Sequence, residues 1–153
     1  MITSESREER PVLRLNRVIA APPERVFAAW TTPDAIKGWF GPADCRVLDA
    51  RVDLRVGGEY CFSLSTQRLG EIKVRGQYRE VTPPAKLIYT WRWEGSPELG
   101  PETSLVTVRF IPHGTATDIQ LTHEQLPSIE SRDAHSHGWR GAFEQLEKYL
   151  LSS

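Results

Sequence analysis

The feature that most constrains the fold is a series of six strand-like segments between residues 44 and 124. In each segment apolar and polar side chains alternate, which is the period of a β-strand with one buried face. The turns between them are short and rich in glycine and proline, as at Gly57-Gly58 and Pro83-Pro84. Such turns cannot hold a crossover helix, so the pattern predicts a mostly sequential antiparallel sheet. The predicted strands are 44–50, 59–65, 70–81, 86–93, 104–112 and 116–124.

Helical patterns flank this series on both sides. A strand over 12–20 is followed by apolar residues at helical spacing after Pro22-Pro23, and the pattern stops where Thr32 precedes a proline. A second short helix is predicted over 33–39, and the last twenty or so residues return to helical periodicity. The order predicts an α+β domain with two short helices after the first strand, in which the long C-terminal helix covers the apolar face of the sheet.

Composition limits the classes of function. The 153 residues fit one hydrophobic core, so we expect a flexible N-terminus over 1–11 and a single domain over 12–153. A net charge of −1 without a basic cluster argues against nucleic acid as a partner. The apolar runs are too short to span a membrane, and the polar N-terminus does not resemble a secretory signal, so we expect a cytoplasmic protein.

Motifs for cofactor chemistry are missing from the sequence. It contains no phosphate-binding loop, dinucleotide fingerprint, nucleophile elbow or metalloprotease pair, so no cofactor is expected. Two cysteines, Cys45 and Cys61, are too few for a disulfide framework and are interpreted as small, partly buried hydrophobic residues. Alternation along its strand directs Cys61 away from the inward face, which argues against a Cys-His nucleophile.

Two histidines begin the C-terminal helix in the stretch DAHSHGWRGAF. They are two residues apart and therefore about 200° apart around a helix, so His135 and His137 cannot share a metal ion. His135 begins the apolar stripe that contains Trp139, whereas His137 lies on the wet face. His123 ends an inward-facing strand, so His123 and His135 are expected to meet at one end of the interior. With no third ligand beside them, no metal site is predicted.

The sequence also resembles a known family. Five ordered motifs carry the resemblance: APPERVFAAWTTPDAIKGWFGP, DLRVGGEYCF, GQYREVTPPAKLIYTWRW, SLVTVRFIPHGTATDIQLTHEQLP and DAHSHGWRGAFEQLEKYL. They are similar to bacterial proteins related to the C-terminal domain of the activator of the heat-shock protein 90 ATPase, in the START-like (SRPBCC) superfamily. The resemblance covers about residues 12–151. It implies a helix-grip fold, in which a curved antiparallel sheet of about seven strands wraps around the C-terminal helix and leaves a cavity.

For function, the resemblance and the inward-facing aromatic residues lead to one main hypothesis: a cavity that binds a small hydrophobic or aromatic molecule. The resemblance places the helical aromatic residues Trp30, Trp39 and Phe40 near the cavity entrance. The full set of residues expected to contact the ligand is Trp30, Trp39, Phe40, Tyr60, Phe62, Tyr78, Trp91, Trp93, His123, His135 and Trp139.

Several alternatives stay open at this point. The inward aromatic residues are also what a filled core would contain, and His135 would then close the edge of that core with hydrogen bonds to the backbone. A cavity enzyme of the cyclase, dehydratase or hydrolase kind would use a histidine as general base. An interaction protein would dock through the exposed aromatic pair in KGWFGP, with the chaperone as the named partner. Only about eleven residues precede the first strand, so direct stimulation of a chaperone ATPase is not expected. Dimerisation through a sheet edge is left undecided.

Overall fold

The computed structural model describes residues 10–152, and most of the segment predicted to be a flexible N-terminus lies outside these residues. Seven antiparallel strands form one sheet in the order β1-β7-β6-β5-β4-β3-β2, so the first strand closes the meander by pairing with the last. The predicted α+β architecture and strand number are therefore confirmed. The strands are β1 (Leu13–Ile19), β2 (Cys45–Val52), β3 (Glu59–Thr66), β4 (Gly70–Thr82), β5 (Lys86–Glu94), β6 (Thr103–His113) and β7 (Ala116–Glu124).

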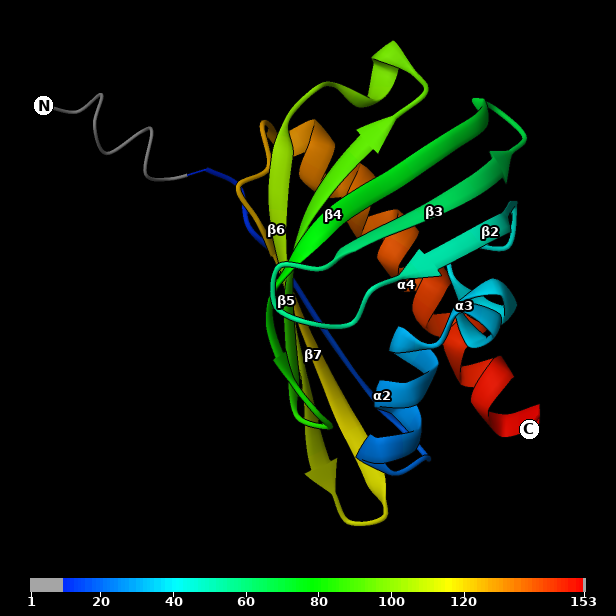
Figure 1. Ribbon diagram of the computed structural model, residues 1–153, viewed down its shortest axis with the longest axis vertical. Coiled ribbons are helices and arrows are strands. Elements are labelled where there is room, and N and C mark those ends of the chain that lie inside the picture. Colours follow the sequence, from blue (N-terminus) through cyan, green and yellow to red (C-terminus); the bar gives the residue numbers. More distant parts are fainter. Residues whose placement is uncertain (1–9, 153) are drawn as a thin grey trace, which may run out of the picture.

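The helices gather on one side of the curved sheet (Figure 1). These are α2 (Pro23–Thr31), α3 (Pro33–Trp39) and the long α4 (Ile129–Ser152), with a short 3-10 turn η1 (Pro97–Leu99) between β5 and β6. Five residues of α4 are buried, among them Trp139, Phe143 and Leu146. The apolar stripe of the C-terminal helix thus covers the sheet, as the sequence predicted.

Prolines set the bounds of the two short helices. Pro23 and Pro33 each occupy the first turn of a helix, where the missing N–H has no intrahelical partner to lose. Between the helices Thr32 is extended, with φ −99° and ψ 123°, because the following proline disfavours the helical conformation. The break turns the chain so that α3 begins at once in a new direction.

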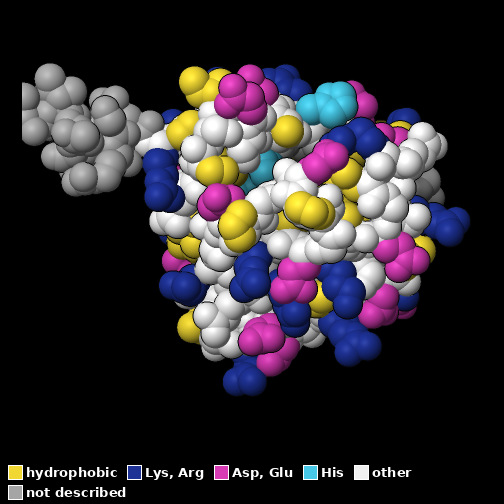
Figure 2. All heavy atoms as spheres, turned by 90° about the horizontal axis from the view of Figure 1, so that it is seen from above, with side chains coloured by type: hydrophobic (Ala, Val, Ile, Leu, Met, Phe, Trp, Pro, Cys, Tyr) yellow, Lys and Arg dark blue, Asp and Glu magenta, His cyan; other side chains and the backbone are white. Residues whose placement is uncertain are grey.

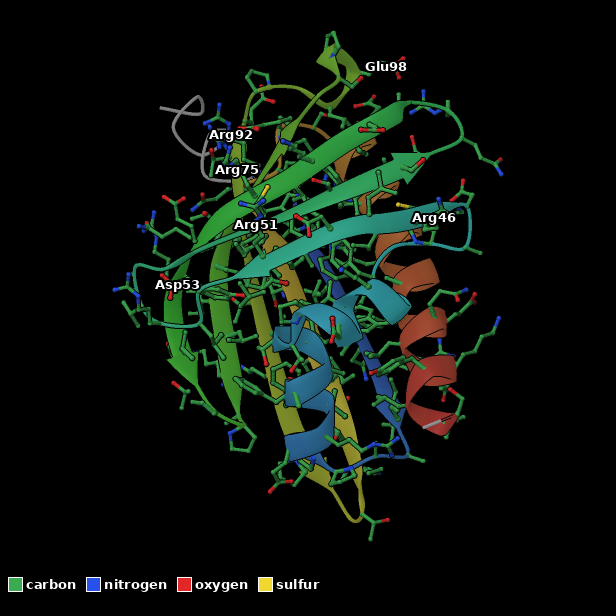
Figure 3. The ribbon with its side chains drawn as sticks, turned by 45° about the vertical axis from the view of Figure 1, so that its right-hand side comes forward. Arg46, Arg51, Asp53, Arg75, Arg92 and Glu98 are labelled. Atoms are coloured by element: carbon green, nitrogen blue, oxygen red, sulfur yellow. The ribbon has the colours of Figure 1, made fainter. Side chains whose placement is uncertain are left out.

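Alternation along the strands separates an apolar inner face from a charged outer face. Tyr60 and Phe62 are buried inside, whereas Cys61 between them pairs across the sheet with Arg51 on one side and Arg75 on the other. In Figure 3 the labelled arginines of β2, β4 and β5 lie over the outer surface of the sheet. The prediction that Cys61 points away from the interior is confirmed, and both cysteines are free thiols.

Candidate ligand-binding cavity

A cavity of about 260 Å³ lies between the first half of α4 and the adjoining ends of β3, β4 and β5. It is partly open at the end of the molecule shown in Figure 2, where hydrophobic side chains gather among charged ones. Its sheet and loop walls contain Phe40, Gly41, Pro42, Asp44, Cys45, Leu64, Thr66, Arg68, Leu69, Ile72, Trp91, Trp93 and Leu99. Its helical wall contains Ala134, His135, His137, Gly138, Trp139 and Ala142.

The charged groups of the cavity belong to its rim. Asp44 and Arg68 are exposed, and the guanidinium of Arg68 pairs with the carboxylate of Glu98 at 2.6 Å. This ion pair connects the turn between β3 and β4 to η1, which carries the apolar wall residue Leu99. Both partners are more than half exposed, so the pair contributes at most about 1 kcal/mol to stability. The deeper walls are therefore mainly apolar and aromatic.

His135 lies in the helical wall with both ring nitrogens bonded to protein. The indole N–H of Trp93 donates to Nε2 at 3.0 Å, and because an indole nitrogen only donates, Nε2 must carry a lone pair. Nδ1 lies 2.7 Å from the carbonyl oxygen of Ser131, one turn earlier in α4, so Nδ1 holds the proton and donates it. The partners therefore fix His135 as a neutral ring with a defined tautomer.

His123 lies behind the wall and has no exposed surface. Its Nδ1 accepts from the indole N–H of Trp139 at 3.1 Å, which assigns the proton to Nε2. Nε2–H then donates to the hydroxyl of Ser104 at 2.7 Å, and that hydroxyl donates to the carbonyl oxygen of Trp91 at 3.3 Å. The result is a chain of hydrogen bonds that connects α4, β7, β6 and β5.

The two imidazole rings are in contact, with their centroids 4.8 Å apart. Burial lowers the pKa of His135, against the opposing effect of its bond to Ser131. Burial, together with the neighbouring His135, lowers the pKa of His123 well below its ordinary value. Both effects agree with the hydrogen bonds, because a protonated ring would leave a Trp N–H facing another N–H. The expected meeting of the two histidines is confirmed.

The cysteine in the cavity wall is poorly suited to nucleophilic chemistry. Burial, assisted by the nearby carboxylate of Asp44, raises the pKa of the Cys45 thiol to about 11. Since the thiolate is the reactive form, Cys45 is held almost entirely as the unreactive thiol near neutral pH. It contributes to the wall as a small apolar side chain.

The residues predicted to contact a ligand separate into three places. Phe40, Trp91, Trp93, His135 and Trp139 line the cavity. A void of about 10 Å³, at the lower limit for one water molecule, is lined instead by Trp30, Trp39, Tyr60, Phe62 and Tyr78, with Phe40 shared between the two. His123 lies behind Trp91 and Trp139. Trp30 and Trp39, expected near the entrance, are only 5% and 2% exposed and belong to the interior.

Hydrogen bonds and ring packing explain why the residues around the small void leave no room for a ligand. The indole of Trp30 donates to the hydroxyl of Tyr89, and the indole of Trp39 donates to the carbonyl of Ala29. Their ring centroids are 4.8 Å apart. This part of the structure is a filled aromatic core.

Sequence reasoning missed much of the cavity wall. Alternation along the strands places Leu64 and Ile72 on the inner face but does not show that they border a cavity, and Leu69 and Leu99 lie in turns where alternation gives no signal. The available signal was the spacing of Ala134, Gly138 and Ala142, which are four residues apart and therefore share one side of α4. A glycine inside a helix commonly allows a close approach by another segment, but Gly138 does not serve this purpose. A Cβ at that position would meet nothing within 4 Å.

Residues 10–152 contain neither a metal-binding cluster nor a membrane-spanning helix. Within residues 10–152 no group of three or more His, Cys, Asp or Glu side chains is placed to hold a metal ion. None of the helices formed by these residues combines the length and the hydropathy needed to cross a membrane.

A curved antiparallel sheet that closes over a long C-terminal helix, with two short helices after the first strand, defines a helix-grip protein of the START-like class. Within that class, the chain belongs to the family of Activator of Hsp90 ATPase homolog 1-like proteins, whose family model matches residues 20–151.

Solved structures agree with this assignment. A Chromobacterium violaceum protein is 30% identical over 90% of this chain and 96% of its own, with a TM-score of 0.75. The AHSA1 protein of Silicibacter pomeroyi is 26% identical over 92% of this chain and 98% of its own, with a TM-score of 0.80. A Nitrosomonas europaea protein is 26% identical over 92% and 94%, with a TM-score of 0.77. A search of curated proteins finds no match to the chain.

Proposed function

We propose that the protein binds a small hydrophobic or aromatic molecule in the cavity between α4 and the sheet. The observation that carries this proposal is a partly open space of about 260 Å³, walled mainly by apolar and aromatic side chains. Its volume is close to the lower end of the range typical of small-molecule sites, about 300–1,000 Å³. A filled core would leave no such space, because protein interiors pack at the density of organic crystals.

The state of the histidines favours binding over general-base catalysis. A general base needs a free lone pair within reach of the proton that it removes. The lone pair of His135 is directed to the indole of Trp93, and that of His123 to the indole of Trp139. Burial also lowers the pKa of both rings, which makes them weaker bases. The two histidines therefore support a ligand wall by orienting its tryptophans.

The proposal is tested by screening a panel of lipids, polyketides and aromatic compounds for an increase in Tm. A ligand that binds only the folded chain stabilises it by about 2.7 kcal/mol at a concentration one hundred times its Kd. Compounds that raise Tm are then titrated into ¹⁵N-labelled protein. We expect the amides of 41–45, 64–72 and 134–142 to shift, since these segments supply the walls.

The outer face of the sheet provides the internal control. The amides of Arg51, Cys61 and Arg75 form one row across that face and should not shift. The proposal is wrong if no compound changes Tm and protein purified from its own host retains no small molecule in native mass spectrometry. It is also wrong if the bound compounds shift the outer row instead of the cavity segments.

A further inference from the structure

Helix α4 has two interior glycines, and only one has a packing reason. A Cβ on Gly141 would come within 2.8 Å of the Pro42 ring, so this glycine lets the loop after α3 approach the helix. A Cβ on Gly138 would meet nothing within 4 Å. Because an interior glycine weakens a helix relative to alanine, Gly138 has no apparent benefit for folding. What it provides is open space at the cavity wall.

The space over Gly138 is extended along the helix by two further small residues. Ala134, Gly138 and Ala142 all line the cavity, and their spacing of four residues places them on one side of α4. The sheet side of the same cavity includes the aromatic rings of Trp91 and Trp93. The small side chains on α4 leave a flat surface opposite the aromatic wall, and a flat molecule fits between two such surfaces.

An independent observation concerns the indole N–H groups. The indoles of Trp30, Trp39, Trp93 and Trp139 all donate hydrogen bonds within the protein. Among the described residues, Nε1 of Trp91 is the buried side-chain nitrogen or oxygen without a hydrogen-bond partner. Trp91 is 4% exposed and lines the cavity. A buried donor without a partner is unfavourable, so a ligand with a hydrogen-bond acceptor would supply the bond that this N–H lacks.

The remaining polar groups of the wall exclude a charged ligand centre. Both nitrogens of His135 are bonded to protein, and the Cys45 thiol is held neutral by its raised pKa. The ionisable side chains Asp44, Arg68 and His137 lie at the exposed rim, and Arg68 is paired with Glu98. A charge placed deep in the cavity would lose its hydration without gaining a partner.

We propose that the cavity binds a flat, uncharged ring compound with one hydrogen-bond acceptor, an inference that rests on the proposed function. The ring lies against Gly138, and the acceptor bonds the indole N–H of Trp91. A 150 Å³ cavity holds benzene, so by proportion 260 Å³ holds about ten non-hydrogen atoms, the size of a two-ring system. The nitrogen of Trp91 is itself covered, so the acceptor reaches it when the indole turns toward the cavity. Gly138 then determines specificity by leaving room for the ring.

The position of the ligand is tested with two probes of nearly equal shape, the ketone 1-tetralone and the hydrocarbon tetralin. Their Kd values are measured by calorimetry on the wild type, Gly138→Ala and Gly138→Leu. We expect Gly138→Leu to weaken both probes at least tenfold, because the added side chain fills the open space, and Gly138→Ala to have a smaller effect. Glu144→Leu is the control, since Glu144 is exposed on α4 and outside the cavity. Equal effects of Gly138→Leu and Glu144→Leu would overturn the assigned position.

The role of Trp91 is tested by comparing the same probes on Trp91→Phe and Trp139→Phe. Both changes remove an indole from the wall, but the N–H of Trp139 already donates to His123. We expect Trp91→Phe to weaken tetralone about three- to tenfold more than tetralin, since only the ketone can accept the bond. Trp139→Phe should change both affinities by the same factor.

A measurement on the wild type covers the case in which a variant does not fold. The ¹⁵N spectrum contains signals from the indole N–H groups, and tetralone should move that of Trp91 downfield, whereas tetralin should not. If tetralone binds without moving it, or if Trp91→Phe affects both probes equally, the inferred hydrogen bond is wrong while the proposed function stands. If neither probe binds, the inferred ring class is wrong, and the lipid and polyketide arms of the Tm screen decide the proposed function separately.

Discussion

At the scale of single residues, the aromatic interior tolerates two imidazoles because every ring nitrogen has a partner. His123 is fully buried, yet its two nitrogens are bonded to Trp139 and Ser104. A buried polar group without such partners would reduce stability by about 1–3 kcal/mol. The position of His123 follows from strand alternation, but its tautomer depends on rotamers in two other elements. Sequence reasoning therefore located the histidine and not its bonds.

The bond from His123 to Ser104 gives a first prediction. Ser104→Ala removes the acceptor and leaves the Nε2–H of His123 buried without a partner, so the free energy of unfolding should fall by about 1–3 kcal/mol. Urea denaturation at pH 7.5 measures the change. Ser63→Ala is the matched control, because Ser63 lies on the outer face between Asp49 and Lys73 and should change stability by less than about 0.5 kcal/mol. Equal losses in the two variants would show that the bond contributes nothing.

The two glycines of α4 give opposite predictions for stability. Gly138→Ala should raise the free energy of unfolding by about 0.5–1 kcal/mol, because alanine stabilises a helix interior and its Cβ meets no other atom. Gly141→Ala should lower it, since the new Cβ would come within 2.8 Å of Pro42 and force the loop away. Thermal denaturation of both variants checks the signs. A gain in Gly141→Ala would contradict the account of the close approach.

At the scale of elements, the start of α4 positions the helical wall of the cavity. The hydroxyl of Ser128 accepts from the backbone N–H of Ser131 at 3.1 Å, and the carbonyl of Ser128 accepts from the N–H of Arg132. Ser128 is therefore the N-cap of the helix. His135 follows within two turns, so the cap fixes the segment that carries it.

Removing this cap should weaken the first turns of α4. Ser128→Ala should lower the free energy of unfolding by about 0.5–2 kcal/mol. Amide hydrogen exchange should accelerate more in 129–135 than in the second half of the helix. Ser136→Ala is the control, because the hydroxyl of Ser136 bonds an exposed arginine, Arg140, and no backbone N–H. A uniform change along α4 would argue against local capping.

The elements themselves were largely predictable from the sequence. The predicted second helix, 33–39, and last strand, 116–124, coincide with α3 and β7, because proline positions and alternation act locally. The cavity was less predictable because it is a gap between elements. Tyr60, Phe62 and Trp91 all follow the same inward pattern. Tyr60 and Phe62 nevertheless pack in a filled core, whereas Trp91 borders the cavity. The difference depends on the size of the side chains facing them, including Gly138.

At the scale of the whole molecule, the two faces of the sheet differ in chemistry. Its outer face is charged, and Arg75 shares Glu94 with Arg92 there. Its inner face is apolar, and the cavity of about 260 Å³ opens where α4 presents small residues. The family relationship establishes this architecture, while the proposed binding specificity rests on the few side chains around the opening.

The buried histidine pair predicts how the stability of the whole molecule depends on pH. Both rings are neutral when folded because burial lowers their pKa below 6.5, whereas in the unfolded chain they take up protons near pH 6.5. Below pH 6.5 the unfolded state therefore binds more protons, and stability falls as pH falls until the folded pKa values are reached. Above pH 6.5 the two states bind equally and this contribution is constant.

Each buried histidine should contribute a slope of up to about 1.4 kcal/mol per pH unit between pH 6 and pH 5. Urea denaturation at pH 7.5, 6 and 5 measures the slope, and His135→Gln should reduce it by about one such contribution because one titrating ring is removed. His137→Gln is the matched control, since His137 is exposed on the same helix. If His135→Gln and His137→Gln gave the same slope, the neutral bonded state of His135 would not be what limits stability in acid.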